Sequence, residues 1–367
     1  MGTPAAPATP VRIDVKSRAG GYPVVIAPGL SAAVPALLSE IHHPAKMVLV
    51  SNATVWRFHG DRFRALSSEE PILLPDGERF KHLHVVGRVY EGLIRARADR
   101  GSTVVAIGGG VLGDTAGFAA ATYMRGVPLV HVPTTLLAQV DSAIGGKVGV
   151  NHAAGKNLIG AFHPPVLVAV DPELLSTLPR REFRAGLYET IKYGVIASRT
   201  LFDTLNESLS AIFARETAPL MRAIADSVRI KADVVGQDEH ESGVRRTLNF
   251  GHTVGHALEA VTKYRRFRHG EAVGYGMLAA AHIGSERGAM PAADRDALAA
   301  LIAAMGPLPA VGDVSAAQVL EAIGHDKKIV NGRLHFVLPK AIGSCDVVDD
   351  VTTGEIERAL AALGLAR

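Results

Sequence analysis

Three histidines within residues 245–271 have the types and spacing best suited to metal or proton chemistry in this chain. His252 and His256 are four residues apart. On a helix they share one face, about 6 Å apart along the axis. Two such imidazoles can bind one divalent cation together, or one can bind it while the other transfers protons. His269 follows an arginine-rich turn and could fold back as a third ligand. The same histidines could instead be structural, because this spacing is common.

A carboxylate and an amine lie one helical turn apart in GLYETIKYG, at Glu189 and Lys192. On a solvent-exposed helix such a pair is an ordinary ion pair. Their neighbours Leu187, Ile191 and Tyr193 are apolar, however. A carboxylate buried among them requires a cation or a metal ion.

Arg245 and Asn249 are four residues apart, and Asn249 precedes His252 by three. One helical face could therefore present a fork for a carboxylate or phosphate beside the imidazoles. Lys231 and Glu241 either join this polar set or lie on a solvated helix face. Lys327 and the adjacent Lys328 are either surface charges or further anion-binding residues, located toward the C-terminal end of the sequence.

A glycine-rich loop, Gly108 to Gly110 with Gly113 and Asp114, follows an apolar strand-like run and precedes a helical pattern. Glycines there let the backbone approach a diphosphate, and the helix N-terminus offers free N–H groups. The spacing differs from G-x-G-x-x-G, and a tight turn without a ligand is the alternative. Thr134 and Thr135 follow another strand-like run and would lie on the same edge of the sheet.

Anion-binding side chains follow in glycine-flanked segments, which the sequence predicts to be turns. Lys147 comes after Gly145-Gly146, and Lys156 with Asn157 comes after Gly155; Asp141 and Arg125 lie upstream. A flexible backbone can direct an ammonium group at an anion, although ordinary surface lysines are the alternative. Together these residues favour an anionic substrate.

The elements that must position these residues fall into two groups. Apolar strand-like runs begin near residues 11, 22, 46, 71, 102, 128 and 164, and helical patterns separate several of them. This pattern predicts an α/β domain with a mostly parallel sheet over residues 1–178. Long helical patterns dominate residues 179–367, which we expect to form a mostly α-helical domain that binds metal and substrate.

Composition limits the classes of function. Nearly half of the 367 residues are apolar, the formal net charge is +3, and Cys345 is the single cysteine. The mixed charge argues against a general nucleic-acid binder, and a lone cysteine indicates a reducing compartment. No apolar run approaches the roughly 18 residues that a membrane helix requires. We therefore expect a cytoplasmic protein that does not bind membranes.

The segments GGGVLGDTAGFAAATYMRG, VPTTLLAQVDSAIGGKVGVN, GKNLIGAFHPP, GLYETIKYG and RRTLNFGHTVGHALE together resemble the 3-dehydroquinate synthase family of sugar-phosphate cyclases. The resemblance implies a Rossmann-like NAD-binding domain and a helical metal-binding domain. It also implies bound NAD and one divalent metal ion, zinc or cobalt. The implied reaction converts 3-deoxy-D-arabino-heptulosonate 7-phosphate to 3-dehydroquinate and phosphate in the shikimate pathway. It proceeds by transient oxidation, phosphate elimination, reduction and intramolecular aldol closure. A homodimer is a further expectation.

The resemblance also assigns residues by position. Glu189, His252 and His269 match metal ligands, whereas His256 matches a catalytic histidine that is not a ligand. Glu241, Lys147, Lys192 and Arg245 match other catalytic positions. The implied substrate contacts are Arg125, Asp141, Lys147, Asn157, Lys192, Lys231, Arg245, Asn249 and Lys327. The implied NAD contacts are Asn52, Glu78, Lys81, Gly108, Gly109, Gly110, Asp114, Thr134, Thr135, Lys156, Leu174 and Thr177. Two positions depart from the pattern, because the family often has Asp at the Ser51-Asn52 loop and Asn or Ser at Ala185.

Three alternatives share parts of this pattern. A related cyclase could act on sedoheptulose 7-phosphate, although Arg245 and Asn249 suit a substrate carboxylate. An iron-type polyol dehydrogenase would share the two-domain plan but would not need so many anion-binding lysines. A protein that senses NAD or metal without catalysis would not need His256 together with Lys147.

Overall fold

The computed structural model describes residues 9–18, 20–43, 46–241, 243–324, 329–330 and 333–366. The chain forms two compact units. The first comprises Met1–Pro179 and Ala214–Glu239, and the second comprises Arg180–Phe213 and His240–Arg367. The predicted domain boundary, between residues 178 and 179, lies one residue before the chain first passes into the second unit. The segment Ala214–Glu239 then returns to the first unit.

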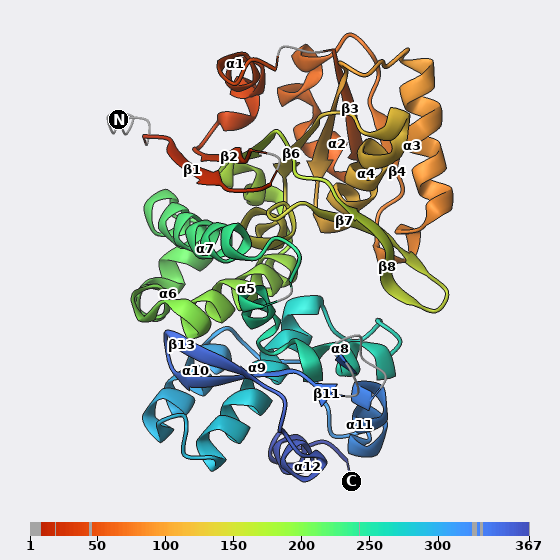
Figure 1. Ribbon diagram of the computed structural model, residues 1–367. Coiled ribbons are helices and arrows are strands. Elements are labelled where there is room, and N and C mark those ends of the chain that lie inside the picture. The colour runs from red at the N-terminus through yellow and green to blue at the C-terminus, as the bar shows by residue number, and fades with distance from the viewer. Residues whose placement is uncertain are drawn as a thin grey trace. The chain divides into compact units, whose positions relative to one another are not determined.

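The first unit is built on a seven-stranded sheet of order β1-β2-β9-β6-β5-β3-β4 (Figure 1). Its strands are β1 (Val11–Val15), β2 (Tyr22–Ile26), β3 (Met47–Asn52), β4 (Ile72–Leu74), β5 (Thr103–Gly108), β6 (Leu129–Pro133) and β9 (Leu167–Val170). β1 pairs antiparallel with β2, and the other pairings are parallel. The predicted strands and the mostly parallel sheet are confirmed.

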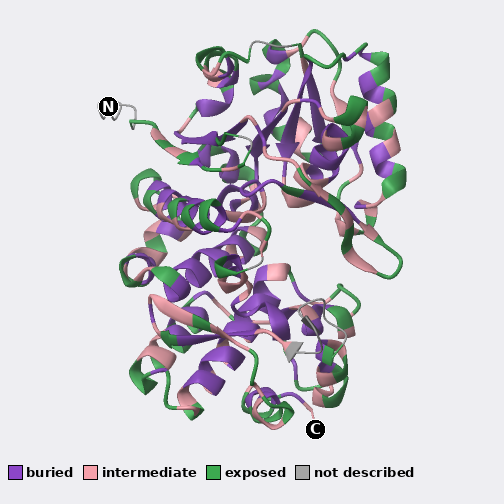
Figure 2. Cartoon of the chain, in the orientation of Figure 1, coloured by how far each residue is buried: buried purple, intermediate pink, exposed green. Residues whose placement is uncertain are grey.

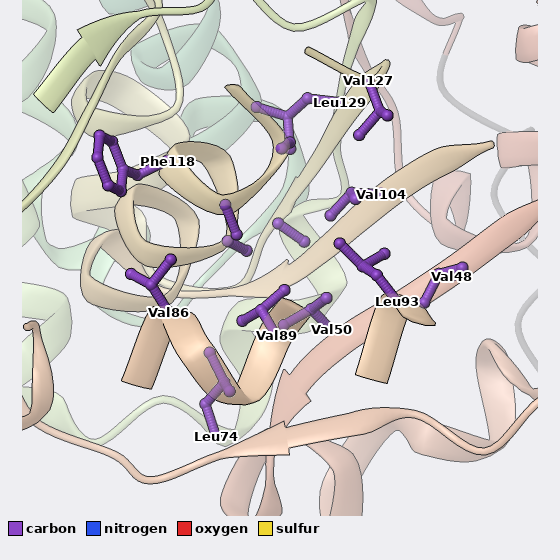
Figure 3. Packing of buried hydrophobic residues seen from close by; sticks show 14 of the residues in the cluster. Val48, Val50, Leu74, Val86, Val89, Leu93, Val104, Phe118, Val127 and Leu129 are labelled. Carbon is purple, nitrogen blue, oxygen red and sulfur yellow. The ribbon is translucent and has the colours of Figure 1, made fainter. Parts of the chain in front are cut away.

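Side chains alternate across the sheet, and each face packs against its own apolar layer. In β5, Val104 and Ala106 join a cluster with α3 (Leu83–Arg95) and α4 (Gly110–Thr122), part of which Figure 3 shows. Val105 and Ile107 of the same strand join the opposite cluster. That cluster includes residues of η1 (Leu30–Ala33) and α1 (Val34–Glu40) and the segment after α2 (Ala53–His59). Burial on both faces explains why these strands are continuous apolar runs (Figure 2).

A β-hairpin lies between β6 and β9 in the chain, over residues 147–162. The prediction of glycine-flanked turns for these residues was wrong. β7 (Lys147–His152) pairs antiparallel with β8 (Gly155–Phe162). Gly149 and Gly160 face each other, and a Cβ on either would lie 2.6 or 2.5 Å from a carbonyl oxygen of the opposite strand. The glycines thus permit close strand approach.

Short helices and one long helix complete the first unit. The short ones are η2 (Gly60–Arg62), η3 (Arg64–Leu66), η4 (Glu78–Phe80), η5 (Tyr123–Arg125), the π-helix η6 (Ala138–Ser142) and η7 (Pro172–Thr177). The long helix is α7 (Thr217–Gln237), which packs against β1, η6 and η7.

The second unit is mostly helical, as predicted. Its helices are α5 (Arg180–Ala197), α6 (Arg199–Phe213), η8 (Val244–Asn249), α8 (His252–Val261), α9 (His269–Glu286), α10 (Ala292–Ala304), α11 (Ala316–Gly324) and α12 (Thr353–Ala362). Its strands form two short antiparallel pairs, β10 (Ile329–Val330) with β11 (Arg333–Leu334) and β12 (Phe336–Ala341) with β13 (Ser344–Val348). Among the described residues, no helix has the length and hydropathy of a membrane span.

The backbone of α9 packs directly against the backbones of two neighbouring segments. A Cβ added to Gly276 would lie 1.7 Å from the carbonyl oxygen of Gly251, the residue before α8. A Cβ added to Gly270 would lie 2.0 Å from the carbonyl oxygen of Ala185 on α5. Glycine at these two positions therefore brings α5, α8 and α9 together.

A buried ion-pair network fixes the start of α9. The fully buried Glu271 carboxylate accepts hydrogen bonds from Arg181 at 2.8 and 2.7 Å and from Arg184 at 3.0 Å. It also accepts from the Arg268 backbone N–H at 2.8 Å, which caps α9. Burial raises the pKa of Glu271, but these hydrogen bonds outweigh it and hold the pKa below its usual value.

Replacing Gly276 with alanine should force α9 away from the N-terminus of α8. We expect the free energy of unfolding to fall by about 1–3 kcal/mol, the usual cost of overpacking. The matched control is Gly87→Ala in α3, where no atom lies within 4 Å of the added Cβ. That change should stabilise the helix by up to about 1 kcal/mol. Urea unfolding followed by circular dichroism measures both, and equal stability of the two variants would contradict this packing.

Candidate active site

Three helices of the second unit bring two imidazoles and one carboxylate to a common point. Nε2 of His252 on α8 lies 3.7 Å from Oε1 of Glu189 on α5. Nε2 of His269, the first residue of α9, lies 3.5 Å from the same oxygen. The expectation that His269 folds back toward the α8 histidines is met, because its ring centroid lies 5.2 Å from that of His252.

The Nδ1 atoms of both imidazoles face away from Glu189 and have their own partners. Nδ1 of His252 lies 3.0 Å from the carbonyl oxygen of Phe250, and Nδ1 of His269 lies 3.2 Å from Oε2 of Glu259. With a proton on Nδ1, each imidazole faces Glu189 with its Nε2, the arrangement that metal-binding histidines adopt. Two imidazole nitrogens and one carboxylate oxygen form a donor set that fits zinc or cobalt.

His256 lies beside this donor set on the same helix. Its ring centroid lies 5.2 Å from that of His252 and 5.8 Å from that of His269, and ligand atoms of the three histidines fall within 4.8 Å of one another. The geometry alone therefore admits His256 as a ligand or as a proton-transfer group.

Positive charge around Glu189 is supplied in part by Lys192, whose Nζ pairs with Oε2. Both side chains are buried, so the pair is not the exposed one that the sequence left open. Burial lowers the pKa of His269, but the carboxylates of Glu259 and Glu189 outweigh it and raise the pKa to about 10. The site thus attracts positive charge.

In the first unit, the glycine-rich loop joins β5 to α4 as predicted. Gly109 precedes α4, and the Thr134 backbone N–H donates to the carbonyl oxygen of Gly108 at 3.0 Å. A Cβ on Gly109 would lie 2.9 Å from Thr135 Cγ2, and one on Gly110 would lie 2.8 Å from Ser142 Oγ. Glycine at these two positions therefore permits close packing against Thr135 and Ser142. Separately, the backbone N–H groups at the α4 N-terminus suit a diphosphate, which fits NAD.

Polar residues beside this loop form one network. Lys81, which is 4% exposed, pairs with Asp114 and donates to Asn157 Oδ1 at 2.6 Å. Asn151 donates to Glu78 Oε1 at 2.7 Å and accepts from the Asn157 backbone N–H at 2.9 Å. Burial raises the pKa of Asp114, and the Lys81 ammonium opposes that shift. The structure thus groups Glu78, Lys81, Asp114 and Asn157, and it adds Asn151, which the sequence analysis missed.

Four other predicted site residues form two contacting pairs. Lys231 on α7 binds Asp141, donating to its carbonyl oxygen at 2.7 Å and pairing with its carboxylate. Asn249 donates to Glu241 Oε1 at 2.7 Å. The predicted continuous helical face from Arg245 to His252 was wrong, because η8 ends at Asn249 and Gly251 is left-handed (φ 78°) before α8. Tight turns at residues 250 and 251 separate the two helices.

The remaining predicted contacts, apart from Lys327, lie in the first unit. Asn52 caps α2 by accepting from the Val55 N–H at 2.8 Å, and Leu174 is buried in the apolar core. Thr177 Oγ1 lies 2.8 Å from Nε2 of His59, a residue that sequence analysis missed. Lys147 and Lys156 lie on the hairpin strands β7 and β8, and Arg125 lies in η5. Lys327 lies outside the described residues.

Three predicted residues have left-handed backbones that only glycine adopts freely. They are Arg125 (φ 70°), Asn157 (φ 53°) and Glu241 (φ 62°). Such conformations cost roughly 1–3 kcal/mol and concentrate at functional sites. Six other described non-glycine residues also have positive φ, so this backbone geometry indicates local strain at the three positions and does not by itself identify them as functional.

The fold of this chain is similar to that of solved cyclases whose structures contain NAD+ and a divalent metal ion. A solved 2-epi-5-epi-valiolone synthase from Streptomyces hygroscopicus subsp. jinggangensis 5008, with NAD+ and Zn2+ bound, superimposes with a TM-score of 0.86 at 29% identity. The match covers 96% of this chain and 99% of that one. A 2-deoxy-scyllo-inosose synthase with carbaglucose-6-phosphate, NAD+ and Co2+ matches with a TM-score of 0.83 at 26% identity, over 95% and 99% of the chains.

Sequence comparison narrows this class. Models of the N-terminal and C-terminal parts of 3-dehydroquinate synthase match residues 71–185 and 186–329. A curated 3-dehydroquinate synthase from Nostoc sp. strain PCC 7120 is 47% identical over 358 residues, 95% of this chain and 98% of that protein. The chain belongs to the 3-dehydroquinate synthase family.

His131 lies on β6 beneath the glycine-rich loop, 3.4 Å from a Cβ added to Gly113, and burial lowers its pKa to about 4. The folded protein therefore keeps this imidazole neutral where the unfolded chain takes up a proton. Stability should be lost as the pH falls from about 6.5 through about 4. Between pH 7.5 and 5.5 the free energy of unfolding of the wild type should fall by about 1 kcal/mol more than that of His131→Leu. Urea unfolding at both pH values measures this, and parallel losses would contradict it.

Proposed function

We propose that this protein is a 3-dehydroquinate synthase, an NAD- and divalent-metal-dependent carbon–oxygen lyase of the shikimate pathway. Its substrate would be 3-deoxy-D-arabino-heptulosonate 7-phosphate and its products 3-dehydroquinate and phosphate. The observation that carries the proposal is the convergence of two imidazole Nε2 atoms on one buried oxygen of Glu189. It occurs in a chain 47% identical, over 95% of its length, to a curated 3-dehydroquinate synthase.

In this proposal Glu189, His252 and His269 hold the metal ion, zinc or cobalt. Such an ion lowers the pKa of substrate hydroxyl groups bound to it. The Nδ1 atoms of the two imidazoles contact the Phe250 carbonyl oxygen and the Glu259 carboxylate. His256, adjacent to the ligands, is the proposed proton-transfer group, a role that imidazoles commonly have in enzymes. Glu241, held by Asn249, is a second proton-transfer candidate.

NAD would lie on the first unit, with its diphosphate at Gly108 to Gly110 and the N-terminus of α4. The support is the strand–glycine–helix geometry, together with the Lys81–Asp114 pair beside it. The further proposed contacts are Asn52, Glu78, Thr134, Thr135, Lys156, Leu174 and Thr177. Since the Leu174 side chain is in the core, its contact would come from the backbone.

Cationic and amide side chains would bind the carboxylate and phosphate of the substrate. Ammonium, guanidinium and amide groups suit these two anions. The proposed contacts are Arg125, Asp141, Lys147, Asn157, Lys192, Lys231, Arg245, Asn249 and Lys327. We further infer a cytoplasmic location, which the single cysteine supports, and a homodimer.

Purified protein supplied with the heptulosonate phosphate, zinc and catalytic NAD should release phosphate without lasting absorbance from NADH. The oxidised cofactor is regenerated within each turnover, so phosphate should exceed NAD many times. Sedoheptulose 7-phosphate, as a parallel substrate, tests the related cyclases. Phosphate release from that sugar alone, or steady accumulation of NADH from a polyol, would refute the proposed activity.

His252→Ala should abolish metal binding and turnover together, because it removes one of three ligands. Zinc content after dialysis and phosphate release are the two measurements. His282→Ala on α9 is the matched control, since His282 pairs with Glu286 away from the donor set. Full zinc content and activity in the His252 variant would exclude His252 from the site.

A further inference from the structure

Glu259 is a buried carboxylate on α8 that none of the proposed roles uses as a ligand. It is 5% exposed, and its Oε2 lies 3.2 Å from Nδ1 of His269. A buried carboxylate needs a hydrogen-bonded or charged partner, and this contact supplies one. This contact is made to His269, the imidazole that α9 contributes to the donor set.

Helix geometry aligns Glu259 with the α8 histidines. Glu259 follows His252 by seven residues and His256 by three, so all three lie on one face of the helix. The three side chains therefore point toward the first turn of α9, where His269 lies. This spacing in the sequence could have identified Glu259, although it lies in the otherwise apolar run HALEAV.

The two ends of the His269 ring have different partners. Nδ1 faces Glu259 Oε2, and Nε2 faces Glu189 Oε1 at 3.5 Å. An imidazole that binds a metal ion keeps one proton, on its other nitrogen, and a carboxylate holds that proton more strongly than a neutral acceptor does. The Glu259 carboxylate thus favours the tautomer whose Nε2 lone pair points to Glu189.

The two metal-binding imidazoles are held differently. His252 is oriented by a backbone carbonyl, that of Phe250, two residues away on the chain. His269 is oriented by a side chain from another helix, so its position depends on α8 and α9 together. A single substitution at Glu259 can therefore remove the interaction that orients His269.

We propose that Glu259 is a positioning residue for the metal site, whose carboxylate fixes the tautomer and orientation of the His269 imidazole. The inference rests on the proposed function of Glu189, His252 and His269 as metal ligands. A carboxylate that only neutralises a protonated His269 would stabilise the metal-free protein and so oppose metal binding, and its removal would strengthen metal binding. A positioning carboxylate has the opposite effect, because its removal weakens metal binding.

Zinc dissociation constants of the full-length protein, measured by chelator competition after metal removal, test the inference. Glu259→Ala should bind zinc about 10–100-fold more weakly, the usual effect of losing such a partner. Glu259→Gln keeps an acceptor but loses the charge, so we expect an intermediate loss, at least about threefold. The Co2+ absorption spectrum of each variant should also shift, because the ligand geometry changes.

Glu286→Gln is the matched control, because Glu286 lies 3.3 Å from His282 Nε2 in a similar pair on α9. It should bind zinc like the wild type. Wild-type zinc affinity and cobalt spectrum in Glu259→Gln would overturn the inference, and that variant decides the question if Glu259→Ala does not fold. If the wild type binds no zinc, or if His252→Ala and His269→Ala bind it normally, the proposed metal site itself fails.

Discussion

A carboxylate without access to solvent needs positive charge at its oxygens, and the second unit is organised around this requirement at Glu189. Lys192 meets one oxygen from the same helix, while His252 and His269 approach the other from α8 and α9. Burying an isolated carboxylate costs several kcal/mol, so these three helices must keep their mutual positions. Gly276 permits part of that arrangement, because no side chain separates α9 from the start of α8.

The same constraint explains why the site favours a cation. With Nδ1 of each imidazole already donating, the two Nε2 atoms and Glu189 Oε1 present electron pairs to one point. Without a bound cation, a proton occupies the Nε2 electron pair of His269, because the carboxylates of Glu259 and Glu189 raise the pKa of His269. A divalent ion satisfies all three donors at once, which neither Lys192 nor a single proton does.

Much of the first unit follows from sequence because its strands are buried on both faces. Runs such as Val104 to Ile107 are continuously apolar, and this pattern with helical segments between predicts a parallel sheet. The β7–β8 hairpin was not predicted, because its glycines serve close strand approach and resemble turn residues in the sequence. The packing of α7 with the first unit was not predicted either, because it depends on contacts with β1 and η6, which are distant in the chain.

The site was predictable where its residues are close in the chain. The spacing of His252 and His256 was informative, and apolar neighbours marked Glu189 as a buried carboxylate. Asn151, His59 and Glu259 were missed because their partners come from other elements. The resemblance supplied the proposed roles that spacing left open, above all the distinction between His252 and His256 as ligands.

The path of the chain has a consequence for biosynthesis. The first unit is interrupted, since α7 returns to it only after α5 and α6 of the second unit have been made. The ion pair between Lys231 and Asp141 joins the two segments of the first unit. During synthesis on the ribosome, therefore, β1 and η6 of the first unit cannot be covered by α7 until residues up to 239 have emerged, and α5 and α6 of the second unit emerge before that.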